Sequence, residues 1–187
     1  MKENEFVTSD HHWGHANIIK YSKRPFKNVD EMNDNLVNAW NAKVPKGSIV
    51  YHLGDMAFMR PWDFVNLRKR LNGTIRLIRG NHDKSVDKPE VKALFEWIKP
   101  YYESTTDDGT KVVMCHYPFM TWNKSHHGSW NLHGHCHGSL KAPPTKRMDV
   151  GVDTNPNYAP YSFEEVKAYM DARNYQAADH HDQKKRI

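Results

Sequence analysis

Residues 74–83 read TIRLIRGNHD, an apolar run that ends in a glycine and three polar side chains. Residues 48–55, SIVYHLGD, and residues 6–10, FVTSD, have the same form. Short apolar runs that stop at turn residues are typical of buried strands. The intervening residues 30–44 and 61–71 carry apolar side chains at a period of about 3.6 residues, as amphipathic helices do. This alternation predicts an α/β fold with a mainly parallel sheet and crossover helices.

The second half of the chain has a different pattern. Residues 101–105 and 111–115 flank Asp107-Asp108-Gly109, which predicts a β-hairpin. Residues 130–132 and 147–153 are predicted as further strands. Ser162 and Glu165 form a capping-box signature, which predicts a last helix that ends near Arg173. We expect one domain over residues 1–175, followed by a flexible tail over residues 176–187.

Composition limits the classes of partner and compartment. The chain has 187 residues, a net charge of +5 and two cysteines. No apolar run approaches the roughly 20 residues that cross a bilayer, and residues 1–5 are too polar for a secretory signal. Two cysteines do not make a disulfide framework. We therefore expect a cytoplasmic protein that does not bind membranes and whose partners are anionic.

Histidine, aspartate and asparagine recur in five short motifs. They are Asp10-His11-His12, Gly54-Asp55, Gly80-Asn81-His82-Asp83, His116 and Gly134-His135-Cys136-His137. Three motifs follow consecutive predicted strands, and ligands gather at the carboxyl ends of strands in open α/β sheets. Residues two apart in extended chain point the same way, so Asp10 and His12 should share a cavity, as should His135 and His137. Gly134 should let the backbone come close to that cavity.

The motifs contain enough ligands for two metal ions. Two divalent ions would bring four positive charges, while Asp10, Asp55 and a bridging hydroxide would remove three. The remaining charge would attract a phosphate. Carboxylate and amide oxygens mixed with imidazole nitrogens suit manganese, iron, zinc, cobalt or nickel, whereas calcium prefers more oxygens. Phosphate ester hydrolysis dominates the chemistry of such paired ions.

The same motifs resemble the signature of the calcineurin-like metallophosphoesterases, which is D-x-H, G-D, G-N-H-D/E, a single H and G-H-x-H. The resemblance covers roughly residues 6–155, and residues 9–19 resemble the small bacterial and phage members. It implies a four-layer α/β/β/α sandwich. It also implies a first metal held by Asp10, His12 and His137, a second metal held by Asn81, His116 and His135, and Asp55 as the bridge between them.

The resemblance further implies that His82 is a general acid rather than a ligand, oriented by Asp83. Water that bridges two cations loses a proton near neutral pH, and the hydroxide attacks the phosphate in line. The imidazole of His82 would then protonate the leaving oxygen. The sequence thus predicts a metal-dependent phosphoesterase, with manganese favoured and phosphodiesters slightly preferred over monoesters. Its substrate could be a nucleotide.

Several other residues have two interpretations. His15, at the start of a helical run over residues 16–21, could contact the substrate phosphate or be structural. Arg79 could bind phosphate through both guanidinium nitrogens or be an ordinary surface charge. His52 is expected in the core or behind the ligands. His126 and His127 could form a pocket wall or an exposed loop.

Two other functions remain open at this point. The positive charge and the six tryptophans permit a metal-dependent nuclease acting on DNA or RNA, although no basic stripe with interleaved aromatic residues is present. A non-enzymatic scaffold, like the retromer subunit built on the resembled fold, would have a degraded ligand set. All five motifs are intact here, which disfavours a scaffold.

Overall fold

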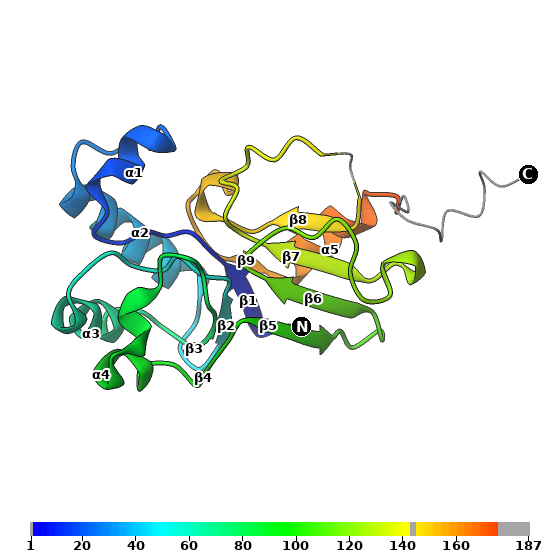
Figure 1. The fold of residues 1–187 in the computed structure, drawn as a ribbon, viewed down its shortest axis with the longest axis horizontal. Helices are drawn as coiled ribbons and strands as arrows, with labels where there is room; N and C mark the ends of the chain where they lie inside the picture. Colours follow the sequence, from blue (N-terminus) through cyan, green and yellow to red (C-terminus); the bar gives the residue numbers. More distant parts are fainter. Residues whose placement is uncertain (1, 143–144, 176–187) are drawn as a thin grey trace, which may run out of the picture.

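The computed structural model describes residues 2–142 and 145–175, which form a mixed α/β fold with two sheets (Figure 1). In the first sheet the strand order is β4-β3-β2-β1-β9. Its parallel strands are β1 (Glu5–Thr8), β2 (Ile49–His52), β3 (Thr74–Ile78) and β4 (Trp97–Lys99). The short β9 (Tyr161–Ser162) pairs antiparallel to β1. The predicted mainly parallel sheet is confirmed, while β4 and β9 were not foreseen.

Helices cover one face of this sheet. They are α1 (Ala16–Tyr21), α2 (Val29–Lys43), α3 (Pro61–Lys69) and α4 (Pro89–Lys92), with a 3₁₀ turn η1 (Lys84–Asp87) before α4. Trp40 of α2 and Phe64 of α3 are buried in one apolar cluster with Ile75 of β3. Figure 1 places α2, α3 and α4 on one side of the molecule and the second sheet on the other. The predicted helices over residues 30–44 and 61–71 are confirmed, with small shifts at their ends.

The second sheet packs on the other face of the first. In its strand order, β5-β6-β7-β8, the hairpin β5 (Tyr101–Thr105) and β6 (Lys111–Cys115) is antiparallel. Strands β7 (Trp130–His133) and β8 (Arg147–Asp149) run parallel to β6. A second apolar cluster joins Val7 and Ile78 of the first sheet to Met114 and Leu132 of the second. Both faces of the first sheet are therefore buried, which explains its continuous apolar strands.

One predicted strand is shorter than expected. The strand predicted over residues 147–153 ends at Asp149, and a 3₁₀ turn η3 (Val152–Thr154) follows it. The strand ends early because the next residues pair with the chain just after β1. Gly151 forms an isolated bridge with Ser9, and the Val152 N–H donates to the Ser9 carbonyl. The chain thus leaves the second sheet to contact the end of the first.

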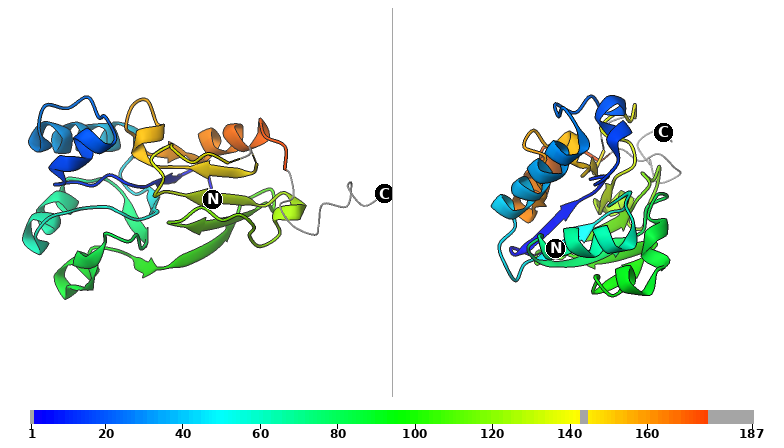
Figure 2. Two further views of the ribbon diagram at one scale, coloured as in Figure 1. Left: turned by 45° about the horizontal axis from the view of Figure 1, so that its top comes forward. Right: turned by 90° about the vertical axis from the view of Figure 1, so that its left-hand side faces the viewer.

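The last helix lies at an edge of the two sheets. Helix α5 (Phe163–Asp171) begins with the predicted capping box, in which the Ser162 hydroxyl accepts from the Glu165 N–H and the Glu165 carboxylate accepts from the Ser162 N–H. Its Val166 and Met170 are buried in the cluster between the sheets. The helix contacts β1, β8 and β9, beside β8 in Figures 1 and 2.

A loop covers the outer face of the second sheet. Within residues 117–129, which include a 3₁₀ turn η2 (Ser125–His127), the Phe119 N–H donates to Asn131 of β7. Arg147 of β8 donates to the Phe119 carbonyl. The predicted tail over residues 176–187 lies outside the described residues. None of the helices described is both long and apolar enough to cross a membrane.

Candidate metal centre

The five polar motifs meet where strands of both sheets end. The Asp10 N–H donates to the Gly54 carbonyl at 3.0 Å, which joins the loop after β1 to the loop after β2. The His135 N–H donates to the Asp10 carboxylate at 2.9 Å, and the Gly134 N–H to the His116 carbonyl at the same distance. The two sheets thereby bring together residues that lie more than a hundred positions apart in the sequence.

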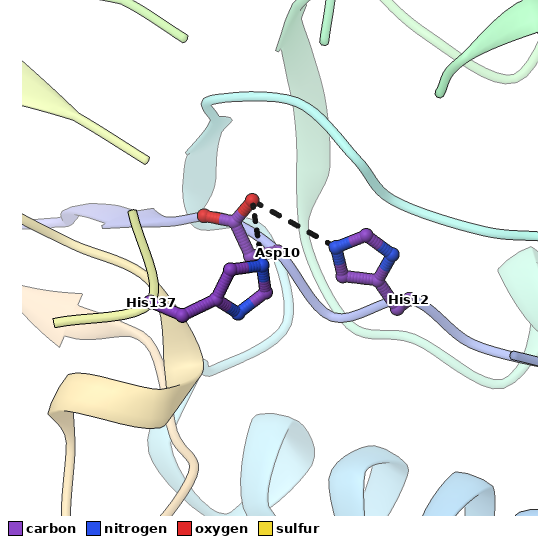
Figure 3. A group of neighbouring side chains, drawn as sticks. All are labelled: Asp10, His12 and His137. Atoms are coloured by element: carbon purple, nitrogen blue, oxygen red, sulfur yellow. Dashed lines mark ion pairs between the residues drawn. The ribbon is translucent and has the colours of Figure 1, made fainter. Parts of the chain in front are cut away.

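The first group of side chains is Asp10, His12 and His137. Each imidazole turns Nε2 toward the same oxygen, Oδ1 of Asp10, at 3.9 Å for His12 and 4.0 Å for His137 (Figure 3). Asp10 Oδ1 and both ring nitrogens of His12 are buried and have no hydrogen-bond partner among the described residues. Buried polar atoms are nearly always satisfied. Asp10 Oδ1 and His12 Nε2, which face each other at 3.9 Å, fit two ligand atoms of a bound cation.

The second group is Asp55, His116 and His135, with Asn81 between the two histidines. Asn81 Oδ1 lies 2.9 Å from His116 Nε2 and 3.1 Å from His135 Nδ1. Nδ1 of His116 lies 2.7 Å from the Leu53 carbonyl oxygen, so Nδ1 carries the proton and donates. Nε2 then carries the lone pair, and it faces Asn81. This tautomer presents a ligand nitrogen to the centre of the group.

Asp55 lies between the two groups. Its Oδ2 is 3.7 Å from His12 Nε2 of the first group and 3.6 Å from His116 Nε2 of the second. Its other oxygen, Oδ1, accepts the His82 N–H at 2.9 Å, which fixes the carboxylate plane. The described geometry therefore offers two adjoining sets of ligand atoms. In each set, the ligand atoms of the two histidines and the aspartate lie within 4.8 Å of one another.

The backbone of the candidate ligands is strained. Positive φ angles occur at Asp10 (57°), His12 (53°), Asp55 (55°), His135 (68°) and His137 (48°). Non-glycine residues seldom adopt this region, and they do so mostly where surrounding structure imposes it at functional sites. Asp10 and His12 do meet in the first group, and His135 and His137 line the same cleft, but the argument from extended chain was wrong. Left-handed turns, rather than strand alternation, aim these side chains.

Two glycines are required by close packing around the carboxylates. A Cβ on Gly80 would overlap Asp55 Oδ1, and a Cβ on Gly134 would overlap Asp10 Oδ2. Gly134 also lies against the Ser9 hydroxyl, itself hydrogen-bonded to Asp10 Oδ2 at 2.5 Å. The expectation that Gly134 permits a close backbone approach is confirmed, with the Asp10 carboxylate as the group approached.

Burial shifts the ionisation of the first group. It raises the pKa of Asp10 to about 8, because a carboxylate with no water around it is costly, although nearby His137 opposes this shift. Burial also lowers the pKa of His12 to about 2. A neutral imidazole is the form that binds metal, and a cation beside Asp10 would offset the cost of its buried charge.

A buried arginine and an aspartate support the first group, and the sequence patterns did not indicate them. Arg24 donates from Nε and Nη2 to the two oxygens of Asp153, both at 2.8 Å, and from Nη1 and Nη2 to the carbonyls of His11 and Asp10, both at 2.7 Å. Asp153 Oδ2 in turn lies 2.6 Å from His137 Nδ1. Arg24 follows a short helix and Asp153 was assigned to a strand, so neither carried a local signal.

Asp83 has a different role from the expected one. Its Oδ2 accepts from the N–H groups of Asp55 and Gly80, at 2.9 and 2.8 Å, and its Oδ1 accepts from Met56 at 2.9 Å. Both oxygens are thus committed to backbone donors, so Asp83 holds the loops after β2 and β3 together. The expectation that it orients the His82 ring is wrong.

A cleft of about 550 Å³ lies over the centre. His82 is exposed and lines the cleft, with its ring centroid 4.8 Å from Phe58 and 5.9 Å from His12. His15 also lines it, and its ring is stacked on Phe58 at 4.3 Å. His15 Nδ1 is buried with no partner among the described residues.

Other predicted residues lie away from the cleft. Arg79 is exposed and forms a bidentate ion pair with Asp87, at 2.8 and 2.6 Å, so its assignment to substrate binding is corrected. His52 is buried behind the ligands, 2.9 Å from the His11 ring, as expected. The rings of His126 and His127 lie 4.0 Å apart in the exposed turn η2 and do not line the cleft.

Comparison with known proteins gives relatives whose names describe no activity. No family model matches the chain. It is 26% identical over 181 residues to the Gene 66 protein of Mycobacterium phage L5, covering 80% of this chain and 86% of that one. The crystal structure of the protein of unknown function AQ665 from Aquifex aeolicus matches with a TM-score of 0.70 and 23% identity. That match covers 88% of this chain and 97% of the other, and it shows a shared fold.

A further relative is the uncharacterized protein MJ1445 of Methanocaldococcus jannaschii. It is 36% identical to this chain over 167 residues, which cover 85% of this chain and 86% of the relative. Identity at this level over nearly the full length of both proteins establishes common descent. The chain therefore belongs to the same family as MJ1445.

Proposed function

We propose that this chain is a metal-dependent phosphoesterase of the calcineurin-like type. The observation that carries the proposal is the pair of adjoining ligand groups that share Asp55. Two divalent ions held in this way are suited to phosphate esters, because together they can bind the oxygens on both sides of the displaced phosphorus. The unsatisfied buried atoms of Asp10 and His12 support a cation in the first group.

Each side chain has a defined role in this proposal. Asp10, His12 and His137 would hold one ion, Asn81, His116 and His135 the other, and Asp55 would contact both. The ions, with manganese favoured over iron, zinc, cobalt and nickel, would supply Lewis acidity and a nucleophilic water at neutral pH. Arg24 and Asp153 would keep the His137 ring in place.

His82 would protonate the leaving oxygen. Its ring is exposed in the cleft rather than directed among the ligands, and its backbone N–H is bonded to Asp55, which places it beside the ligand set. A protonated imidazole is a general acid that can donate a proton to a leaving oxygen. Proton delivery matters most for a poor alkoxide leaving group, so phosphodiesters are favoured over monoesters. His15, which lines the cleft, would contact the substrate phosphate.

We also propose the four-layer α/β/β/α arrangement of that enzyme family. Helices α2 and α3 and the two sheets supply three successive layers, which supports the proposal. The fourth layer would consist of the segment 117–129, which packs on the outer face of the second sheet.

Hydrolysis of a chromogenic phosphodiester and the matching monoester by manganese-loaded protein tests the activity. We expect turnover that EDTA abolishes, and a kcat that falls roughly 10²–10⁴-fold in His82→Ala while the metal content persists. The matched control is His127→Ala, which removes an exposed histidine outside the cleft. Full activity in His82→Ala would remove the general acid from the proposal. If the protein binds two metals but hydrolyses neither ester, the proposed phosphoesterase activity toward aryl phosphates is overturned.

A further inference from the structure

The wall of the cleft formed by the end of α1 carries residues that the proposed hydrolysis does not use. Tyr21, Ser22 and Lys23, here called the α1 rim, line the cleft together with the candidate ligands. The side chain of Tyr21 is 73% exposed, the second-highest value among the large hydrophobic residues described. Its ring meets His15 edge-on with centroids 6.3 Å apart. A large aromatic ring exposed beside a cleft is available to stack on a planar group of a ligand.

Lys23 supplies an unpaired positive charge on the same wall. Its side chain is exposed, and it is absent from all the ion pairs formed by the described residues. Its φ angle is 52°, a left-handed conformation that lysine seldom adopts. The turn is closed by the Lys23 N–H on the Lys20 carbonyl, at 3.3 Å, and by the Arg24 N–H on the Ile19 carbonyl, at 2.9 Å.

The α1 rim is fixed relative to the candidate metal centre. Arg24 follows Lys23 directly, is 4% exposed, and donates to the carbonyls of Asp10 and His11. The Ser22 hydroxyl lies 3.3 Å from His137 Nδ1. The backbone of the rim is therefore tied to the loop that carries two of the candidate ligands, which keeps the Cα atoms of Tyr21 and Lys23 beside the candidate metal centre.

We propose that Tyr21 and Lys23 form a subsite for a nucleotide that carries a second phosphate, one that is not cleaved. This inference rests on the proposed phosphoesterase function, because it assumes that the scissile phosphate occupies the ligand groups. The base would stack on Tyr21, as bases do on aromatic side chains in nucleic-acid-binding proteins. The second phosphate would pair with the ammonium of Lys23, a compact point charge. The cleft, at about 550 Å³, lies within the size range of small-molecule sites.

Calorimetric titration tests the subsite through binding, with every variant carried in the His82→Ala background so that hydrolysis contributes little heat. The probes are thymidine bisphosphate, with phosphates on both the 5′ and 3′ oxygens, and thymidine 5′-monophosphate, each added to the manganese-loaded full chain. We expect the bisphosphate to bind roughly three- to tenfold more tightly. Lys23→Asn should abolish that difference, since asparagine accepts the left-handed backbone but lacks the charge. Lys23→Arg should keep it. The control Lys20→Asn, on an exposed position of α1 outside the cleft, should also keep it.

The aromatic half of the subsite has its own variants. Tyr21→Ala should weaken the binding of both thymidine nucleotides roughly fivefold to a hundredfold, while Tyr21→Phe, which keeps the ring, should bind both as the unaltered protein does. Equal affinity of Tyr21→Ala and the unaltered chain for both nucleotides would remove base stacking from the inference. An unchanged preference for the bisphosphate in Lys23→Asn would show that Lys23 does not bind the second phosphate.

Failure of this inference and failure of the proposed function give different results. The proposed function stands and the subsite is overturned if the protein hydrolyses aryl phosphodiesters but prefers the bisphosphate equally with and without Lys23. A Lys23-dependent preference in a chain that hydrolyses no phosphate ester keeps the subsite and overturns the function. A single strand of eight thymidines, titrated in parallel at two salt concentrations, separates the two sources of such a nucleotide. Tighter, strongly salt-dependent binding of the strand identifies a nucleic-acid end, and weaker binding identifies a free nucleotide.

Discussion

Asp55 is the side chain that both candidate ligand groups share. Three contacts hold this residue in place. The His82 N–H donates to Oδ1 of Asp55, Gly80 packs against the Asp55 carboxylate, and the backbone N–H of Asp55 donates to the Asp83 carboxylate. The left-handed backbone at Asp55 adds a fourth constraint, since it directs the side chain back between His12 and His116. A carboxylate held this firmly is preorganised to bind metal ions.

The substitution Asp55→Asn tests this role at the residue scale. Asparagine keeps the shape but removes the negative charge between the two groups, so we expect metal bound per chain to fall from two to one or fewer. Mass spectrometry of metal content after dialysis provides the measurement. Asp63→Asn, which alters an aspartate in an exposed ion pair of α3, is the control and should bind as the unaltered chain does. Two ions retained by Asp55→Asn would mean that the groups do not share this ligand.

At the scale of elements, the Arg24–Asp153 pair joins three segments that are distant in the sequence. Arg24 follows α1 and donates to the Asp10 carbonyl in the loop after β1. Asp153 belongs to the 3₁₀ turn η3 that replaces the end of the predicted strand, and it pairs with Arg24 and with His137 in the loop after β7. The side chain of Arg24 is fully buried and that of Asp153 is 6% exposed. Removing one partner of a buried ion pair leaves the other charge uncompensated, which costs more than the pair itself contributes.

A double-mutant cycle on this pair follows from that asymmetry. We expect Arg24→Met and Asp153→Asn each to lower the free energy of unfolding by about 3–5 kcal/mol, and the double variant to lose less than their sum. Urea denaturation of the metal-free protein measures this, with Arg24→Lys as a milder variant. The exposed pair Arg60–Asp63 is the matched control, and its removal should change stability by under about 1 kcal/mol. Additive losses at Arg24 and Asp153 would show that the two side chains do not act as a unit.

At the scale of the whole molecule, the centre forms only when both sheets are in place. Asp10, His12, Asp55 and Asn81 come from loops of the first sheet, while the remaining candidate ligands follow β6 and β7 of the second, His116, His135 and His137. Ions that bind these ligands bind the folded chain and not the unfolded one, so their binding energy adds to the stability of the fold.

Manganese should therefore raise the melting temperature. At a free concentration about a hundred times the dissociation constant, one site contributes roughly 2.7 kcal/mol, which for a chain of this size is about 5–10 °C. Scanning calorimetry in manganese and in EDTA measures the shift. Calcium, which prefers more oxygen ligands, should give a smaller one. The shift should shrink in Asp10→Asn. Equal melting temperatures in manganese and EDTA would contradict the metal centre.

Some features of this protein follow from the sequence alone. Local patterns determine strands β1, β2 and β3, helices α2 and α3, the hairpin around Asp107-Asp108-Gly109 and the capping box at Ser162, because each depends on neighbours a few residues away. The motif residues from Asp10 to His137 could also be selected, since side-chain chemistry and position at strand ends are visible without coordinates.

Only the tertiary structure decided how those side chains are held. The left-handed turns at Asp10 and His12, the anchoring of the ligand loop by Arg24, and the use of Asp83 as a backbone acceptor depend on contacts between distant segments. Arg79 pairs with Asp87 for the same reason, since both partners and their distance exist only in the fold. The physical cause is that a buried polar group takes whatever partner the packed chain brings to it, and local sequence does not encode that partner.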